Sequence, residues 1–161
     1  MSRQVSTKRR QLLEGAAMGL GIVLLPMAGR AQTQAPLQAA DPAQVQAIVD
    51  AFLDGAKPLA QGITLDMPVL GDNPASVPVK VRVDLPMTPQ SYCKEIIILA
   101  EGNPRPLACR FKFTPLAGSA EVAVRLRLIE TQAVQALARM SDGRVLAARQ
   151  HITVTAGGCG M

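Results

Sequence analysis

The chain has 161 residues, of which 48% are apolar, and this is enough for one domain with one hydrophobic core. The formal net charge of +5 would suggest an anionic partner, but most of the excess positive charge lies in residues 1–31. The remainder has no tryptophan and no basic cluster with interleaved aromatic residues, which excludes the stacking platforms that bind nucleic acid.

Residues 1–31 are typical of an export signal, with a basic start, an apolar stretch and the small-residue end "MAGRA". The adjacent Arg9 and Arg10 indicate the twin-arginine route, with general secretion as the alternative. A short buried helix at the start of the domain is the structural alternative. The apolar stretch is too short for a membrane span. We therefore expect a periplasmic protein with no membrane span in the mature chain, which begins with a disordered leader at 32–40.

One amphipathic helix is predicted next, beginning at residue 41. Asp41 is a suitable N-cap and Pro42 a suitable first helical residue, and the segment from Gly55 to Pro58 ends the pattern. The apolar residues recur at helical spacing and share one face: Val45, Ile48, Val49, Phe52, Leu53 and Ala56. We expect this face to pack on the strands that follow.

About seven strands follow, separated by turn signals. The clearest is 77–85, in which valines alternate with charged residues, and in 107–113 the apolar Leu107, Cys109, Phe111 and Phe113 also alternate. The predicted strands are 63–70, 77–85, 92–100, 107–113, 122–128, 132–140 and 144–155. Because no second helical run separates them, we predict a mainly β fold. It is an immunoglobulin-like antiparallel β-sandwich over 41–155, with one N-terminal helix and a flexible tail at 156–161.

Most catalytic sites are excluded by counting residue types. The chain has one histidine, His151, whose strand register predicts a solvent-facing side chain. No cluster of residues has the spacing of zinc ligands, and neither a nucleophile-elbow motif nor a phosphate-binding glycine loop is present. We therefore expect neither catalytic residues nor a metal site, and no enzymatic turnover by this chain alone.

Two of the three cysteines lie on successive predicted strands. Cys93 and Cys109 are joined by the turn "EGNPRP", and an oxidising compartment would allow a disulfide between them. The alternative is that they are two small buried apolar residues that never meet. The register across the turn is not determined by the sequence, so both interpretations stay open.

The third cysteine, Cys159, lies near the C-terminal end, between Gly157, Gly158 and Gly160. A glycine arm is thin and flexible, and a thiolate can form a mixed disulfide or persulfide. No neighbouring cation is evident, so activation must come from the active site of a partner. This pattern favours a carrier that is loaded and unloaded by other enzymes. The alternative is an exported structural or interaction module that uses Cys159 for a permanent intermolecular disulfide.

The chain resembles the SoxY family of sulfur carriers, through the twin-arginine-type start, "VPVKVRVDLPMT", "NPRPLACRFKFTPLAGSAEVAVRLRL", "MSDGRVLAA" and the closing "GGCG". The resemblance implies that Cys159 covalently holds thiosulfate-derived intermediates, that Gly157, Gly158 and Gly160 form a swinging arm, and that no other cofactor is needed. It implies a heterodimer with a SoxZ-like β-sandwich subunit. It also implies three further partners: a c-type cytochrome complex that couples thiosulfate to the cysteine, a hydrolase that releases sulfate and, where it exists, a sulfane dehydrogenase.

Two departures from the family pattern stand out. Met161 replaces the second glycine that usually closes the motif, which affects how the tail enters a narrow active site. Cys93 and Cys109 are additional cysteines, and a bridge between them would prevent them from competing with Cys159 for sulfur.

Overall fold

The structure is a computed structural model that describes residues 38–155. The predicted signal peptide, most of the predicted leader and the whole glycine-cysteine tail therefore lie outside the described residues. Among the described residues, no helix has the length and apolar character required to cross a membrane.

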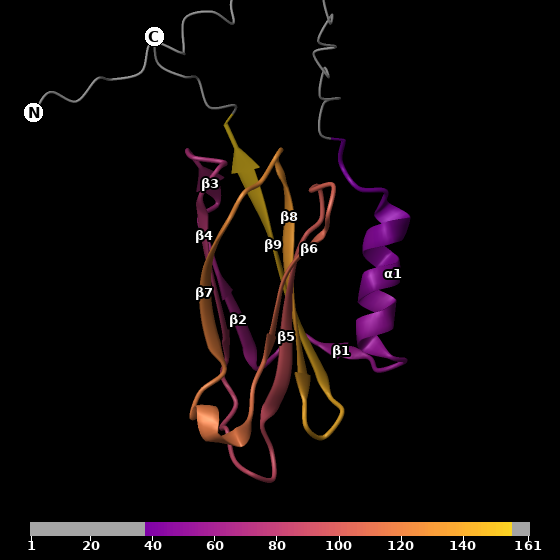
Figure 1. The fold of residues 1–161 in the computed structure, drawn as a ribbon, viewed down its shortest axis with the longest axis vertical. Coiled ribbons are helices and arrows are strands. Elements are labelled where there is room, and N and C mark those ends of the chain that lie inside the picture. The colour runs from indigo at the N-terminus through magenta and orange to yellow at the C-terminus, as the bar shows by residue number, and fades with distance from the viewer. Residues whose placement is uncertain (1–37, 156–161) are drawn as a thin grey trace, which may run out of the picture. The chain divides into compact units, whose positions relative to one another are not determined.

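Three layers make up the described part of the chain (Figure 1). The helix α1 (Pro42–Leu53) covers one face of a large sheet with strand order β1-β9-β8-β5-β6, and a smaller sheet of order β2-β4-β7 covers the other face. The strands are β1 (Pro58–Leu59), β2 (Ile63–Asp66), β3 (Leu70–Gly71), β4 (Val77–Val83), β5 (Cys93–Ala100), β6 (Leu107–Lys112), β7 (Glu121–Leu126), β8 (Gln132–Met140) and β9 (Val145–Val154), with a short 3-10 helix η1 (Pro115–Ala117). The predicted mainly β sandwich with one N-terminal α-helix is confirmed.

The helix α1 forms where its capping residues and apolar spacing predict it. The carboxylate of Asp41 accepts a hydrogen bond from the Ala43 N–H at 2.8 Å, and the helix ends where Asp54 adopts a left-handed φ of 50°. Val49 and Phe52 are buried against a second apolar cluster on the large sheet, which contains Ile97, Leu99, Leu137 and Val145. The helix thus gives the large sheet a second buried face.

The central strand β5 is buried on both faces, which explains its continuous apolar run. Ile96 and Ile98 point into the core between the two sheets, whereas Ile97 and Leu99 point toward α1. By contrast, β4 alternates strictly between buried valines and exposed residues because only one face of the small sheet is covered.

The segment predicted as one strand at 63–70 is two strands in two different sheets. β2 pairs with β4 of the small sheet, whereas β3 pairs in parallel with β9 of the large sheet. Pro68 lies between them, and it lacks the N–H that a continuous ladder would need. The crossing is anchored by Met67, which is buried and whose carbonyl accepts a hydrogen bond from the Gln150 amide at 2.9 Å.

The alternation predicted for 107–113 is also interrupted. The register between β5 and β6 shifts between Ile98 and Leu99, where Cys109 and Leu107 are the paired residues and Ala108 is the extra one. This β-bulge reverses the direction of the side chains. Cys109, Phe111 and Phe113 face the core between the sheets, as predicted, but Leu107 packs in the cluster beneath α1.

Candidate functional site

The residues predicted to form the sulfur-carrying arm, Cys159 with Gly157, Gly158 and Gly160, lie outside the described residues. The described part of the chain ends at Thr155, directly after β9. The end of β9 is the last described segment before this arm in the sequence.

The end of β9 is hydrogen-bonded along both edges. On one edge, the N–H of Thr153 donates to the Val69 carbonyl at 2.9 Å and the N–H of Thr155 donates to the Gly71 carbonyl at 3.4 Å. On the other edge, the N–H of Val154 donates to the Thr131 hydroxyl oxygen at 3.0 Å. That hydroxyl in turn donates to the Val154 carbonyl at 3.4 Å. The chain is thus held in place up to Thr155.

Gly71 allows β3 to approach this end of β9 closely. A Cβ atom added at Gly71 would lie 3.2 Å from the Ile152 Cδ1 atom and 3.2 Å from the Val154 Cγ1 atom. These contacts are tighter than ordinary van der Waals packing. A glycine is therefore the residue that fits beside β9 without displacing β3.

A polar network fixes the loops at the same end of the sandwich. Gln132 is buried; its side-chain oxygen accepts from the Gly102 N–H at 2.8 Å, and its amide nitrogen donates to the Asn103 side-chain oxygen at 3.0 Å. Asn103 also donates to the Arg127 carbonyl at 2.8 Å. The loop between β5 and β6 is therefore tied to the connection between β7 and β8, in which Thr131 also lies.

A groove of about 620 Å³ lies between α1 and this end of β8 and β9, and Thr131 is part of its wall. Its only basic lining residue, within the described part of the chain, is Arg149. The two carboxylate oxygens of Glu101 accept hydrogen bonds from Arg149, each at 2.7 Å, and this raises the pKa of the guanidinium. Glu130 adds a second carboxylate to the lining. The one basic residue of this groove, among the described residues, is therefore already paired.

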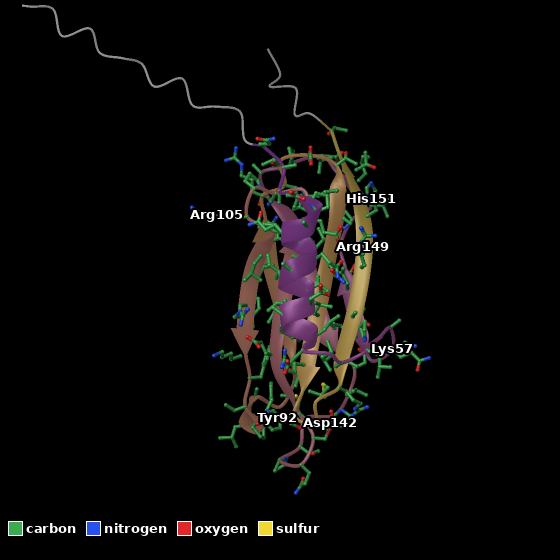
Figure 2. All side chains as sticks on the ribbon, turned by 90° about the vertical axis from the view of Figure 1, so that its right-hand side faces the viewer. Lys57, Tyr92, Arg105, Asp142, Arg149 and His151 are labelled. Atoms are coloured by element: carbon green, nitrogen blue, oxygen red, sulfur yellow. The ribbon has the colours of Figure 1, made fainter. Side chains whose placement is uncertain are left out.

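His151 lies on β9 with an exposed side chain, as its strand register predicts (Figure 2). It alternates with Ile152, which is fully buried. Across residues 38–155, no three His, Cys, Asp or Glu side chains come together as a metal-binding group would require.

Within residues 38–155, Cys93 and Cys109 are not bridged to each other, and both thiols are free. Cys109 is paired with Ile98 of β5, whereas Cys93 lies at the opposite end of β5 and is paired with Met140 of β8. Five residues of extended strand separate Cys93 from Ile98, a distance of roughly 16 Å. A disulfide requires Cα atoms within about 7 Å. The register thus explains why the bridge considered from the sequence is not formed.

Burial lowers the acidity of both thiols. Desolvation raises the pKa of Cys93 to about 11 and also raises the pKa of Cys109, which is only half-buried. Because the thiolate is the nucleophile, both groups are poor acceptors of sulfur near neutral pH.

Sequence reasoning missed the residues that hold the end of β9. Gly71 was predicted to lie in a turn, whereas it belongs to the two-residue parallel strand β3. Thr131 directly precedes a predicted strand, and no motif marks it. Gln132 offered the one usable signal, because it is a polar residue that opens an otherwise apolar run.

The fold and this site define a class: a small β-sandwich protein whose last strand is clamped at the point where a C-terminal segment leaves it. The family model described as sulfur oxidation protein SoxY matches residues 48–159. The chain belongs to the SoxY family, sulfur-carrier proteins of sulfur oxidation.

Solved structures share the fold. The sulfur carrier protein SoxY from Chlorobium limicola f thiosulfatophilum is 23% identical, with a TM-score of 0.58 over 71% of this chain and 99% of that one. A superoxide reductase (neelaredoxin) from Ignicoccus hospitalis is 20% identical, with a TM-score of 0.52 over 59% of this chain and 81% of that one. At these identities the likenesses show the fold alone. No curated protein matches the sequence.

Proposed function

We propose that this protein carries thiosulfate-derived sulfur intermediates as covalent adducts of Cys159 in the periplasm and presents them to partner enzymes. The observation that carries the proposal is the extent of the family match, which continues past the sandwich to residue 159 and so includes the cysteine. The clamp at the end of β9 supports it, because the position from which the tail departs is fixed at Thr155. Four extended residues from Thr155 to Cys159 reach roughly 13 Å.

The proposed loading step joins two sulfur atoms. The Cys159 thiol loses its proton, and its sulfur bonds to the outer sulfur of thiosulfate, which gives a cysteine S-thiosulfonate. Two electrons leave in this step and are accepted by a c-type cytochrome complex. Water then cleaves the bond between the outer sulfur and the sulfonate group, which releases sulfate and leaves a persulfide on Cys159. A sulfane dehydrogenase, where present, oxidises that remaining sulfur.

In this proposal the parts of the chain have separate roles. Residues 1–31 direct export by the twin-arginine route, 32–40 form a leader, 41–155 form the sandwich that binds a SoxZ-like subunit, and 156–161 form the arm with Gly157, Gly158 and Gly160. The paired state of Arg149 supports activation of the thiol by a partner, because this cation is already bound by Glu101. The chain itself is acted on and is not the catalyst.

Intact-protein mass spectrometry after incubation with thiosulfate and the cytochrome complex tests the proposal. We expect a thiosulfonate adduct on the wild-type chain, no adduct on Cys159→Ser, and an undiminished adduct on the matched control Cys109→Ser. Treatment with a thiol reductant should remove the adduct.

An adduct that persists in Cys159→Ser would contradict the proposal. Non-reducing electrophoresis tests the structural alternative at the same time. A stoichiometric covalent dimer through Cys159 that no partner enzyme can resolve would favour a permanent intermolecular disulfide instead.

A further inference from the structure

The strand β6 is an open edge of the large sheet. It ends the strand order, and within the described residues its ladder hydrogen bonds go to β5 alone. An unpaired edge strand presents backbone donors and acceptors that another strand can pair with. The opposite edge of the sheet, at β9, is covered by β1 and β3.

Apolar side chains remain partly exposed on the inner side of β6. The two sheets meet there without a covering strand, since β7 is the edge of the small sheet. Five apolar residues of this open seam face the core yet stay half-buried, whereas core residues of the central strands are fully buried: Cys109, Phe111, Phe113, Val122 and Val124. The seam is therefore incompletely packed.

A groove of about 400 Å³ lies on the outer side of β6, between this strand and α1. Ile48, Ala51 and Leu107 contribute its apolar wall. Arg139 is also part of its lining, with the guanidinium 4.9 Å from the centre of the Phe52 ring and a hydrogen bond to the Phe52 carbonyl. The Nε atom of Arg139 is buried and has no hydrogen-bond partner among the described residues. The groove thus has an apolar wall, the Glu95–Arg110 ion pair and the partly unsatisfied Arg139 in its lining.

The charges along this edge are predominantly positive. Arg110 is paired with Glu95 at 3.0 Å, but Lys112 on β6 and Arg105 in the preceding loop form no ion pair with the described residues. Both are exposed, and Arg105 lies on the flank of α1 opposite Arg149 (Figure 2). Two such edges would repel each other, which opposes self-pairing and favours an acidic partner.

We propose that β6 is the docking edge for the SoxZ-like β-sandwich subunit, which adds an extended, acidic edge strand to the large sheet. Successive side chains of an added strand point to opposite faces. Apolar residues on one face would enter the groove beside Ala51, and those on the other would cover the seam beside Phe111. Acidic residues would pair with Lys112 and Arg105. This inference rests on the proposed function and names the surface that its partner uses.

Isothermal titration of the purified SoxZ-like subunit into the full chain tests the docking edge. Ala51→Glu fills the groove and adds a negative charge, so we expect it to weaken binding by about tenfold or more. Lys112→Glu should weaken binding by about tenfold and reduce its salt dependence. The matched controls are Ala43→Glu, on α1 outside the groove, and Lys57→Glu, on the opposite flank of the molecule (Figure 2). Both should bind as the wild type does.

A second measurement does not depend on how the variants fold. In Cys159→Ser, saturating partner should slow maleimide labelling of Cys109 and slow amide exchange along β6. Unchanged labelling and exchange, equal affinities for test and control variants, or no binding to the wild-type chain would each overturn the docking proposal. Sulfur loading on Cys159 is measured separately, so failure of this surface would leave the proposed function standing.

Discussion

The two edges of the large sheet differ in how completely they are closed. At the β9 edge, β1 pairs with Val145 and Leu146, and β3 pairs with Thr153 and Val154. At the β6 edge, the strand is bulged and pairs with β5 alone among the described strands, with half-buried side chains on its inner face. The closed edge fixes the end of β9 up to Thr155, and the open edge is the surface that we propose for a partner. In this proposal, one sheet separates anchoring of the arm from recognition of the partner.

The same substitution beneath α1, on β9, and at the open seam, on β7, should give the largest contrast in stability. Val145→Ala removes a side chain that is 1% exposed beneath α1, and we expect it to lower the free energy of unfolding by about 2 kcal/mol. Val122→Ala, at the half-buried seam, should cost less than about 1 kcal/mol. Urea denaturation, fitted with one m value for both variants, measures the two losses of unfolding free energy. Equal costs would show that the open seam is packed as tightly as the cluster beneath α1.

Adding one methyl group at Gly71 should loosen the β9 edge of the large sheet locally, where β3 pairs with it. In Gly71→Ala, the new methyl group meets the terminal carbons of Ile152 and Val154, and we expect a loss of about 1 kcal/mol together with a small displacement of β3. Hydrogen exchange should accelerate at the amides of Thr153 and Thr155, which donate to β3 and its preceding residue.

The amide of Val154 provides the internal control for Gly71→Ala. It donates to Thr131 on the other edge of β9, so its exchange should change least. Uniform acceleration at all three amides would indicate that the whole strand end is loosened and would contradict two independent clamps.

The elements with local signals were the predictable part of the fold. The N-cap at Asp41 and the alternating valines of β4 are encoded by adjacent residues, and both elements formed as predicted. The β-bulge at Ala108 and the change of sheet between β2 and β3 depend on partners distant in the sequence. No local pattern specifies them, because register is decided by tertiary packing.

The candidate site also has one part that adjacent residues encode and one part that depends on residues distant in the sequence. Cys159 could be recognised because a reactive thiol between glycines is a signal carried by adjacent residues. The family match includes its position. The clamp formed by Gly71 and Thr131 could not be predicted, because each contacts β9 across a gap of more than twenty residues. The sequence thus predicts which residue holds sulfur, whereas the structure shows how the end of β9 is fixed up to Thr155.

The two free thiols should differ in their rate of alkylation, because one lies in the interior and the other at the open seam. Of the predicted changes, this one should affect stability least. In Cys159→Ser, alkylation should label Cys109 at the half-buried seam and leave Cys93 unmodified until the protein unfolds, because Cys93 is fully buried. Mass spectrometry of proteolytic peptides measures both sites. Modification of Cys93 at the rate of Cys109 would show that β5 is not a protected interior strand.

The raised pKa of Cys93 also predicts a dependence on pH. The buried thiol stays protonated up to a pKa of about 11 in the folded chain, whereas the unfolded chain releases this proton from about 9 upward. The unfolded state therefore binds fewer protons between these values, and the contribution of Cys93 to stability is complete below pH 9 and is lost as the pH rises toward 11. Cys93→Ala should flatten this alkaline decline relative to Cys109→Ala. Parallel declines in the two variants would assign the loss to groups other than the interior thiol.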